Sequence, residues 1–234
     1  MDINDILNVL KADNWRFERK FLISGLSKYE IEGIIKLHPA MFSEIYQERA
    51  VNNIYFDTFE MSNYLDNING NSHRIKVRIR WYGNLFGNII NPVLEFKIKK
   101  GAVGSKVSFP LDTIKIDNNL TIEAIYKVFK KTGAPDVVKF YLMNLRFSML
   151  NCYTRKYFQS ADKRFRITID SGMRFITLSP MQNSFLNESV DYTRTVLELK
   201  YEKDDDYAER ITNFFPFRLT RSSKYVTGIE QLNF

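Results

Sequence analysis

The chain has 234 residues, of which 44% are hydrophobic, and a formal net charge of +7. This length supports one sizeable core, and no window approaches the roughly 18 apolar residues that span a bilayer. The single cysteine, Cys152, excludes an intrachain disulfide and a cysteine-based metal cluster. No signal peptide is visible, so a reducing, cytoplasmic location is expected. The positive charge indicates an anionic partner, and its distribution decides which kind.

The first half of the sequence predicts mostly strands. Hydropathy periodicity indicates a helix over 3–10, a strand over 16–23, a helix over 27–38 opened by a Ser27–Glu30 capping box, and a strand over 51–58. A hairpin of two strands, 73–83 and 91–101, and a short strand over 105–111 follow.

The second half begins with two predicted helices, over 121–133 and 135–150. Strands are predicted again over 151–159, 164–172, 173–179 and 194–202, then a helix from Asp204 and a strand over 217–229 that runs into a loop or short helix. Alternating strands with grouped helices indicate an α+β fold with a mostly antiparallel sheet. We expect one domain over 1–234, with a helix in residues 1–15 preceding the sheet.

One stretch, "HRIKVRIRW" (73–81), alternates strictly between charged and apolar side chains. Successive side chains of a strand point to opposite faces, so one face is cationic and the other apolar. The same pattern recurs in "RFERKF", "VLEFKIKK", "RFRITID" and "TVLELKYE". Like charges on neighbouring strands repel one another, and an anion held between the strands would relieve this repulsion.

A barrel would gather these faces if the strands curl until the charged sides point inward. We therefore predict a closed antiparallel β-barrel of about eight strands, with a cationic interior and helices packed outside. The candidate interior set holds fifteen basic and four acidic side chains, so the rest of the chain is slightly acidic. This localisation argues against nucleic acid, which favours a basic outer patch. The set is Arg16, Lys20, Arg74, Lys76, Arg78, Arg80, Lys97, Lys99, Lys106, Arg155, Arg164, Arg166, Lys200, Arg221 and Lys224, with Glu18, Glu95, Asp170 and Glu198.

A cationic interior of this kind suits a chain of phosphates. Arginine binds phosphate oxygens bidentately, and lysine supplies a compact point charge. A carboxylate among them suits Mn²⁺ or Mg²⁺, which are often bound by one or two carboxylates together with substrate phosphates. Glu95 either binds such a metal or balances neighbouring lysines, and Asp57 either contacts substrate or, as we favour, caps a turn.

These motifs, in this order, resemble the polyphosphate polymerase (VTC) domain of the vacuolar transporter chaperone complex and its bacterial relatives. That family belongs to the triphosphate tunnel metalloenzymes of the CYTH-like superfamily. The resemblance runs from about Arg16 to the C-terminus through "FERKF", "NIYFDT", "RIKVRIRWY", "LEFKIKK", "SKVSF", "CYTRKYF", "RFRITID", "LELKY" and "TRSSKYVTGI". Two positions depart from the pattern. Arg16 stands where the wider superfamily has glutamate, which favours the polymerase branch, and Arg221 replaces a lysine.

The resemblance implies an enzyme that transfers the γ-phosphate of ATP to a growing polyphosphate chain, with Mn²⁺ or Mg²⁺ as cofactor. The metal would be held by Glu198 and Glu18. The residues implied to hold the triphosphate and the product are Lys20, Arg78, Arg80, Lys97, Arg155, Arg166 and Lys224. Further phosphate contacts are expected from Lys99, Lys106, Lys200, Arg221 and Ser223. A membrane protein that exports the product is a possible partner.

Other functions remain open at this point. A metal-dependent triphosphatase would use the same kind of pocket, but it is expected to carry more carboxylates. A non-catalytic polyphosphate-binding module would need the basic side chains and no metal. A basic nucleic-acid binder is the weakest of the alternatives.

Overall fold

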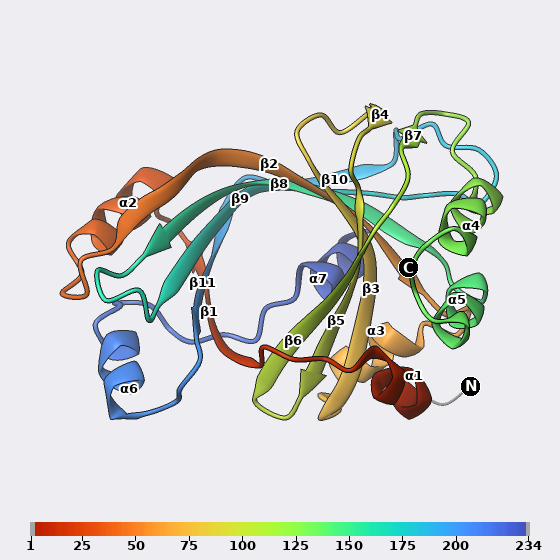
Figure 1. The fold of residues 1–234 in the computed structure, drawn as a ribbon. Helices are drawn as coiled ribbons and strands as arrows, with labels where there is room; N and C mark the ends of the chain where they lie inside the picture. The colour runs from red at the N-terminus through yellow and green to blue at the C-terminus, as the bar shows by residue number, and fades with distance from the viewer. Residues whose placement is uncertain (1–2, 233–234) are drawn as a thin grey trace.

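The structure, a computed structural model, describes residues 3–232. Its central feature is a ring of eight antiparallel strands, in which each strand pairs with the next and the last pairs with the first (Figure 1). The contact between β1 and β6 is the shortest, with only Arg16 opposite Gly104 and Phe17 opposite Val103. Around the ring the strands are β9 (Arg166–Ile176), β11 (Arg194–Tyr201), β1 (Arg16–Ser24), β6 (Val103–Pro110), β5 (Val93–Lys100), β3 (His73–Tyr82), β2 (Ser43–Asp57) and β8 (Arg146–Gln159). The predicted closed barrel is confirmed.

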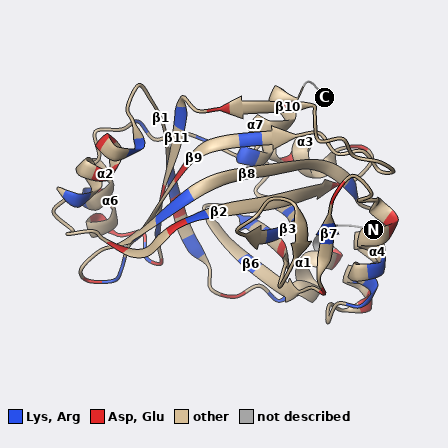
Figure 2. Cartoon of the chain, turned by 90° about the horizontal axis from the view of Figure 1, so that it is seen from above, with Lys and Arg blue, Asp and Glu red and all other residues tan. Residues whose placement is uncertain are grey.

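Most helices cover the outside of the barrel on two opposite sides (Figure 1). On one side lie α1 (Ile3–Leu10), α4 (Ile122–Lys130) and α5 (Asp136–Met143); on the other lie α2 (Lys28–Lys36) and α6 (Asp206–Asn213). Side-chain caps start three of them: Ser27 for α2, Thr121 for α4 and Asp205 for α6. Helices α2 and α4 carry both signs of charge (Figure 2), so these outer helices form no single-sign patch.

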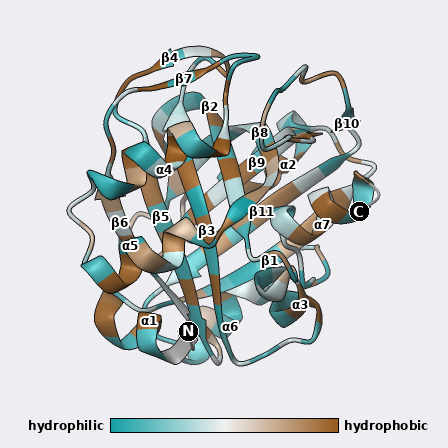
Figure 3. Ribbon diagram, turned by 90° about the vertical axis from the view of Figure 1, so that its right-hand side faces the viewer, coloured by the Kyte–Doolittle hydropathy of each residue, from teal (hydrophilic) through white to brown (hydrophobic). Residues whose placement is uncertain are grey.

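The alternation of the strands explains why the barrel forms. Figure 3 shows hydrophobic and hydrophilic positions following one another along the strands. In β3, Ile75, Val77 and Ile79 are at most 1% exposed and lie in the outer core under α1, α4 and α5. A second outer core, which includes Phe21, Ile167 and Leu199 of the strands, is completed by the residues of α2 and α6. The charged side chains between these positions therefore face the interior.

The last helix, α7 (Lys224–Gln231), lies within the ring of strands (Figure 1). Its Tyr225 and Ile229 pack with side chains on the interior face of β2, β8, β9 and β11, among them Met149, Phe175 and Val196. These side chains are all nearly or fully buried. The helix and this apolar cluster therefore fill one end of the barrel.

Gly228 permits the close approach of α7. A Cβ at this position would overlap atoms of Met149 and Phe175. We expect Gly228→Ala to lower the free energy of unfolding by about 1–3 kcal/mol, because both neighbours are fully buried and cannot move aside. Urea titration measures this change. Gly33→Ala in α2 is the matched control, since its Cβ would meet nothing, and it should leave stability equal or slightly higher; equal losses in both variants would contradict the packing of α7.

The structure corrects the predicted helix over 135–150. Helix α5 ends at Met143, and β8 already begins at Arg146. A register shift between β2 and β8 breaks the alternation at this point. Phe147 and Leu150 join the outer core, while Ser148 and Met149 contact α7, so periodicity alone cannot separate helix from strand there. The predicted strands over 164–172 and 173–179 form one strand, β9, and residues 217–223 contribute only an isolated bridge between Phe21 and Leu219.

Four short elements were not predicted. They are α3 (Ser62–Ile68), the two-stranded β4 (Gly87–Ile89) and β7 (Ile114–Ile116), and β10 (Glu188–Asp191), which extends the sheet beside β9. None of the helices in residues 3–232 has the length and hydrophobicity needed to cross a membrane.

Candidate functional site: a cationic pocket inside the barrel

The interior of the barrel holds a cavity of about 190 Å³, on whose wall basic side chains predominate. Ten basic and only two acidic side chains line it. Glu95 and Asp170 lie buried behind the wall, which leaves six positive charges in excess, out of seven for the whole chain. The net charge of the protein is therefore concentrated in this pocket. The charged lining residues are Arg16, Glu18, Lys20, Lys76, Arg78, Arg80, Lys97, Lys106, Arg155, Glu198, Lys200 and Lys224.

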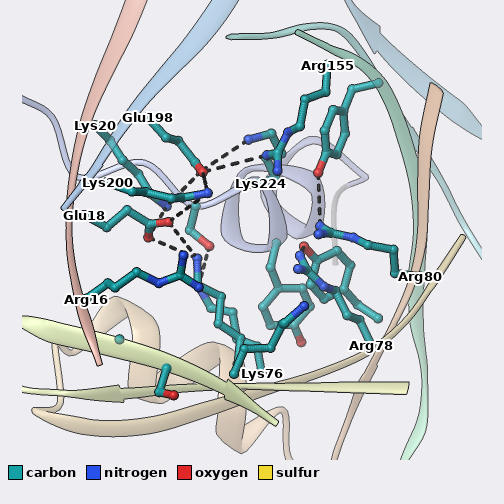
Figure 4. Close-up of a pocket in the computed structure, with 18 of the residues that line it drawn as sticks. Arg16, Glu18, Lys20, Lys76, Arg78, Arg80, Arg155, Glu198, Lys200 and Lys224 are labelled. Carbon is teal, nitrogen blue, oxygen red and sulfur yellow. Dashed lines mark hydrogen bonds and ion pairs between the residues drawn. The ribbon is translucent and has the colours of Figure 1, made fainter. Parts of the chain in front are cut away.

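One wall presents two arginines from β3 (Figure 4). The carboxylate of Glu95 binds Arg78, with Nη2 at 2.6 Å and Nε at 2.8 Å, and its other oxygen accepts from Lys106 at 2.8 Å. Burial alone would raise the pKa of Glu95, but Arg78, followed by Arg80, holds it below its usual range. Both Glu95 oxygens are thus occupied by cations. Of the two roles left open for Glu95, the geometry matches charge balance.

Arg80 has weaker contacts with carboxylates than Arg78 has. Its Nε donates to Asn53 at 2.9 Å and its Nη2 to the Tyr153 hydroxyl at 3.2 Å, whereas Glu95 lies 3.7 Å from Nη1. These neutral partners fix the orientation of the side chain without cancelling its charge. Arg80 therefore presents to the pocket a positioned guanidinium whose charge Glu95 balances only in part.

The opposite wall carries the two lining carboxylates, Glu18 and Glu198 (Figure 4). Lys20 bridges them, with its ammonium nitrogen 3.6 Å from Glu18 and 3.4 Å from Glu198. Lys200 does the same, at 3.7 Å and 3.1 Å. Burial opposes ionisation of both acids, but the lysines hold their pKa values well below the usual range. Both carboxylates are therefore ionised at neutral pH.

Behind this wall, Asp170 positions two further cations. It is fully buried, and its carboxylate binds Arg155 bidentately, at 2.5 Å from Nε and 2.6 Å from Nη2. The same carboxylate lies 2.5 Å from the ammonium group of Lys224. Lys224 is the first residue of α7, so Asp170 also ties that helix to β9. Both cations lie 3.7 Å from Glu198.

Two lysines have weaker compensation. Lys76 donates to the Ser223 hydroxyl at 2.8 Å, and burial together with Lys20 and Lys97 lowers its pKa well below the usual range. Burial also lowers the pKa of Lys97 to about 8, although Glu18 lies 3.0 Å from its ammonium group. A bound polyanion would raise both pKa values again.

Anion binding near pH 8 is therefore expected to take up protons. Isothermal titration with inorganic tripolyphosphate should give a binding enthalpy that depends on the ionisation enthalpy of the buffer. In Lys97→Arg the uptake should decrease, because a guanidinium stays protonated throughout this range. A binding enthalpy that is identical in two buffers at pH 8 would contradict the lowered pKa of Lys97.

The structure brings together most of the side chains that the sequence singled out. Eleven line the pocket: Glu18, Lys20, Arg78, Arg80, Lys97, Lys106, Arg155, Glu198, Lys200, Ser223 and Lys224. Three expected phosphate ligands lie outside its lining. Arg166 is exposed at the first position of β9, Lys99 turns to the carbonyl of Ala102, and Arg221 is exposed in the segment before α7. Arg166 and Lys99 nevertheless pair in register with the lining residues Lys200 and Gly104, so they lie next to the cavity wall.

Sequence reasoning missed the aromatic part of the pocket. Tyr55, Tyr153 and Tyr225 line it, and Tyr55 stacks on Tyr225 with ring centroids 5.1 Å apart. The Tyr225 hydroxyl donates to Asp57, which also accepts from the backbone amides of Asn63 and Tyr64 in α3. Asp57 thus caps α3 and anchors α7, as the capping interpretation predicted. The alternation of the strands could have identified two of them, since Tyr55 and Tyr153 lie at positions of β2 and β8 that face inward.

The donor set fits a divalent metal only together with phosphate. In the described residues no cluster of three or more His, Cys, Asp or Glu side chains is placed to hold a metal ion. Glu18 and Glu198 nevertheless offer two ionised carboxylates that approach the same two lysines. Mg²⁺ and Mn²⁺ accept such an arrangement when substrate phosphates supply further oxygens.

A closed barrel that encloses this many basic side chains belongs to the class of tunnel folds suited to polyanions. Residues 15–233 match the VTC domain, and the chain belongs to that family. The family part of the resemblance is therefore confirmed. No curated protein matches the sequence.

Solved structures share the fold at low sequence identity. A putative adenylyl cyclase from Hippeastrum, described as revealing a dominant triphosphatase activity, has a TM-score of 0.54 and 12% identity, over 92% of this chain and 95% of that chain. A putative adenylate cyclase from Vibrio parahaemolyticus has a TM-score of 0.47 and 11% identity, over 88% and 94%. The Mimivirus capping enzyme triphosphatase has a TM-score of 0.41 and 15% identity, over 92% and 95%. The fold assignment rests on the first.

Proposed function

We propose that the protein is an ATP-dependent polyphosphate polymerase that transfers the γ-phosphoryl group of ATP to the end of a polyphosphate chain. The observation that carries the proposal is the excess of ten basic over two acidic side chains in the lining of the pocket. Membership of the VTC domain family and the fold shared with a protein described as having triphosphatase activity support a triphosphate in this pocket.

The size of the charge excess favours two phosphate substrates over one. A nucleoside triphosphate with one divalent cation carries a net charge of only about −2. With Glu95 and Asp170 counted, the pocket has six formal positive charges in excess, so it would remain cationic with that complex bound. A second polyanion completes the neutralisation. A triphosphatase would need only the triphosphate and water.

The chemistry of transfer also matches the state of the carboxylates. The bond between the bridging oxygen and the γ-phosphorus breaks, ADP leaves with that oxygen, and a terminal oxygen of the acceptor chain forms the new bond. This step consumes no water and releases no proton. Hydrolysis would require a group that activates water, and the lining offers no carboxylate for this besides Glu18 and Glu198, the two proposed metal ligands.

The pocket side chains divide the remaining work. Lys20, Arg78, Arg80, Lys97, Arg155 and Lys224 would bind phosphate oxygens and hold donor and acceptor in line. Lys106, Lys200 and the Ser223 hydroxyl add further contacts. Glu18 and Glu198 would hold Mn²⁺ or Mg²⁺, which neutralises charge on the transferred group when bound. Arg166, Lys99 and Arg221 lie outside the lining and would contact at most the outer part of a chain.

The test is incubation of the purified protein with ATP and Mn²⁺, followed by a polyphosphate-stained gel and an ADP assay. We expect one phosphate unit in the polymer for each ADP that is released. Release of free phosphate without polymer would instead identify a triphosphatase. Neither product, with tripolyphosphate still bound in a titration, would identify a binding module.

A further inference from the structure

Four side chains at one end of the barrel form an aromatic cluster that none of the roles above uses. It consists of Tyr46 and Arg49 of β2, Tyr82 of β3 and Tyr157 of β8. Tyr46 pairs with Tyr157 and Arg49 with Arg155 across β2 and β8, while Tyr82 pairs with Val51. Paired side chains share a face, so all four continue the interior face that carries Arg80 and Arg155. We call them the tyrosine cluster.

The cluster is built around the guanidinium of Arg49. Its central carbon lies 4.7 Å from the ring centroid of Tyr46, 5.7 Å from that of Tyr157 and 5.8 Å from that of Tyr82. The Tyr46 and Tyr157 rings stand perpendicular at 5.6 Å. Two register shifts in β2, on either side of Tyr46, bring these side chains together. Bulges of this kind often re-aim side chains next to active sites.

Arg49 has no acidic partner within 4.0 Å among residues 3–232. The two glutamates nearest in sequence are turned elsewhere, since Glu48 binds Lys28 at 2.9 Å and Glu44 lies 4.0 Å from Lys156. Tyr46 and Tyr82 are each 52% exposed. The cluster therefore presents aromatic rings and a cation without an acidic partner to solvent. Neither ion pairing nor packing of the core explains this arrangement.

The cluster is continuous with the phosphate pocket. The Arg155 guanidinium, which lines the pocket, lies 5.9 Å from the Tyr157 ring centroid. Tyr82 follows the lining residue Arg80 by two positions, which is about 7 Å along a strand. Along β8, Met149, which contacts α7, and Tyr157 of the cluster lie on opposite sides of the lining residue Arg155, so the cluster borders the pocket on the side away from α7.

We propose that the tyrosine cluster is a nucleobase subsite, where the base of a nucleoside triphosphate stacks while its phosphates lie in the pocket. Aromatic rings and arginine planes bind bases through their π-faces, which every base has. The subsite thus selects nucleoside triphosphates over inorganic chains and tolerates different bases. This inference rests on the proposed function only in placing a triphosphate in the pocket.

Titration without metal, so that no turnover occurs, tests the subsite with three probes: ATP, GTP and inorganic tripolyphosphate. Tyr82→Ala should weaken ATP and GTP binding by about ten-fold and change tripolyphosphate binding by less than about two-fold. Tyr82→Phe should restore binding, because the ring and not the hydroxyl does the stacking. Tyr192→Ala, at another exposed tyrosine, is the control and should change nothing.

Equal weakening of ATP and tripolyphosphate in Tyr82→Ala, or no weakening of either, would overturn the subsite and leave the tyrosines as a cover of the barrel wall. The proposed function fails separately, if polymer does not form from ATP. Selective loss of nucleotide binding in a protein that makes no polymer would keep the subsite and remove the polymerase. Failure of both ATP and tripolyphosphate to bind the wild type would overturn both proposals.

Discussion

Replacing Arg80 by alanine is expected to reduce polyphosphate synthesis at least roughly 100-fold. Arg80 presents a guanidinium to the pocket that is held by Asn53 and Tyr153 and lies 3.7 Å from its nearest carboxylate. Its loss would remove charge-assisted hydrogen bonds to phosphate that only a planar, fixed donor makes. The rate of ADP formation with ATP and a polyphosphate primer measures the effect, and Arg80→Lys should fall between wild type and alanine.

Arg166→Ala provides the matched control for that loss. The resemblance to the family assigns Arg166 to the phosphate ligands, but its side chain is exposed at the start of β9 and does not line the cavity. We expect this variant to retain synthesis within a few-fold of wild type. Thermal unfolding of both variants separates chemistry from stability, because Arg80→Ala removes the donor to Asn53 Oδ1 and to the Tyr153 hydroxyl. Equal losses of activity in the two variants would contradict the position of the pocket.

The second large effect is expected from Glu198→Gln. The carboxylate of Glu198 lies within 4 Å of the basic nitrogens of Lys20, Lys200, Arg155 and Lys224. Glutamine keeps the shape and removes the charge that a divalent cation needs. Synthesis should fall at least roughly 100-fold, whereas tripolyphosphate binding without metal should stay equal or strengthen, because the pocket gains a positive charge. These opposite directions distinguish a metal ligand from a phosphate ligand.

Glu95→Gln is the control for the metal. Glu95 is as buried as Glu198, but its two oxygens are held by Arg78 and Lys106. The variant should lose stability without changing the Mn²⁺ concentration that gives half-maximal activity. A shift of that concentration in Glu95→Gln and none in Glu198→Gln would exchange the two assignments.

Strand periodicity carried most of the prediction. The strict alternation in 73–81 placed Arg78 and Arg80 inside and Ile75 and Ile79 outside, because the two faces of a strand differ by one residue. The same argument placed Glu198, whereas Arg155 was indicated by the resemblance to the family. Arg166 shares a face with the lining residue Lys200, its partner in β11, but its side chain is exposed and does not line the cavity, because parity tells which face a residue occupies and not how far the walls enclose it. That depends on how far each strand is staggered relative to its neighbours.

Two other features could not be read from the sequence. Residues 147–150 lose their alternation at a register shift between β2 and β8, where Phe147 and Leu150 face the outer core and the adjacent Ser148 and Met149 contact α7. The position of α7 inside the barrel depends on the fit of Gly228 against Met149 and Phe175, a contact between distant parts of the chain. The tyrosines of the pocket also lie at inward-facing positions of their strands. They were not predicted because the pocket residues were selected by their charge.

The filled end of the barrel has a consequence for how a polymer would grow. Helix α7 and its apolar cluster fill one end, so a chain would not pass straight through the barrel from end to end. For the proposed polymerase, ADP would then leave and ATP would enter on the same side as the product, and each addition would be followed by a partial withdrawal of the chain. After each addition, rebinding of the chain end in the pocket would then compete with dissociation of the chain from the protein. Such a process gives a broad, geometrically decaying distribution of lengths, set by the ratio of the two rates and not by the dimensions of the barrel.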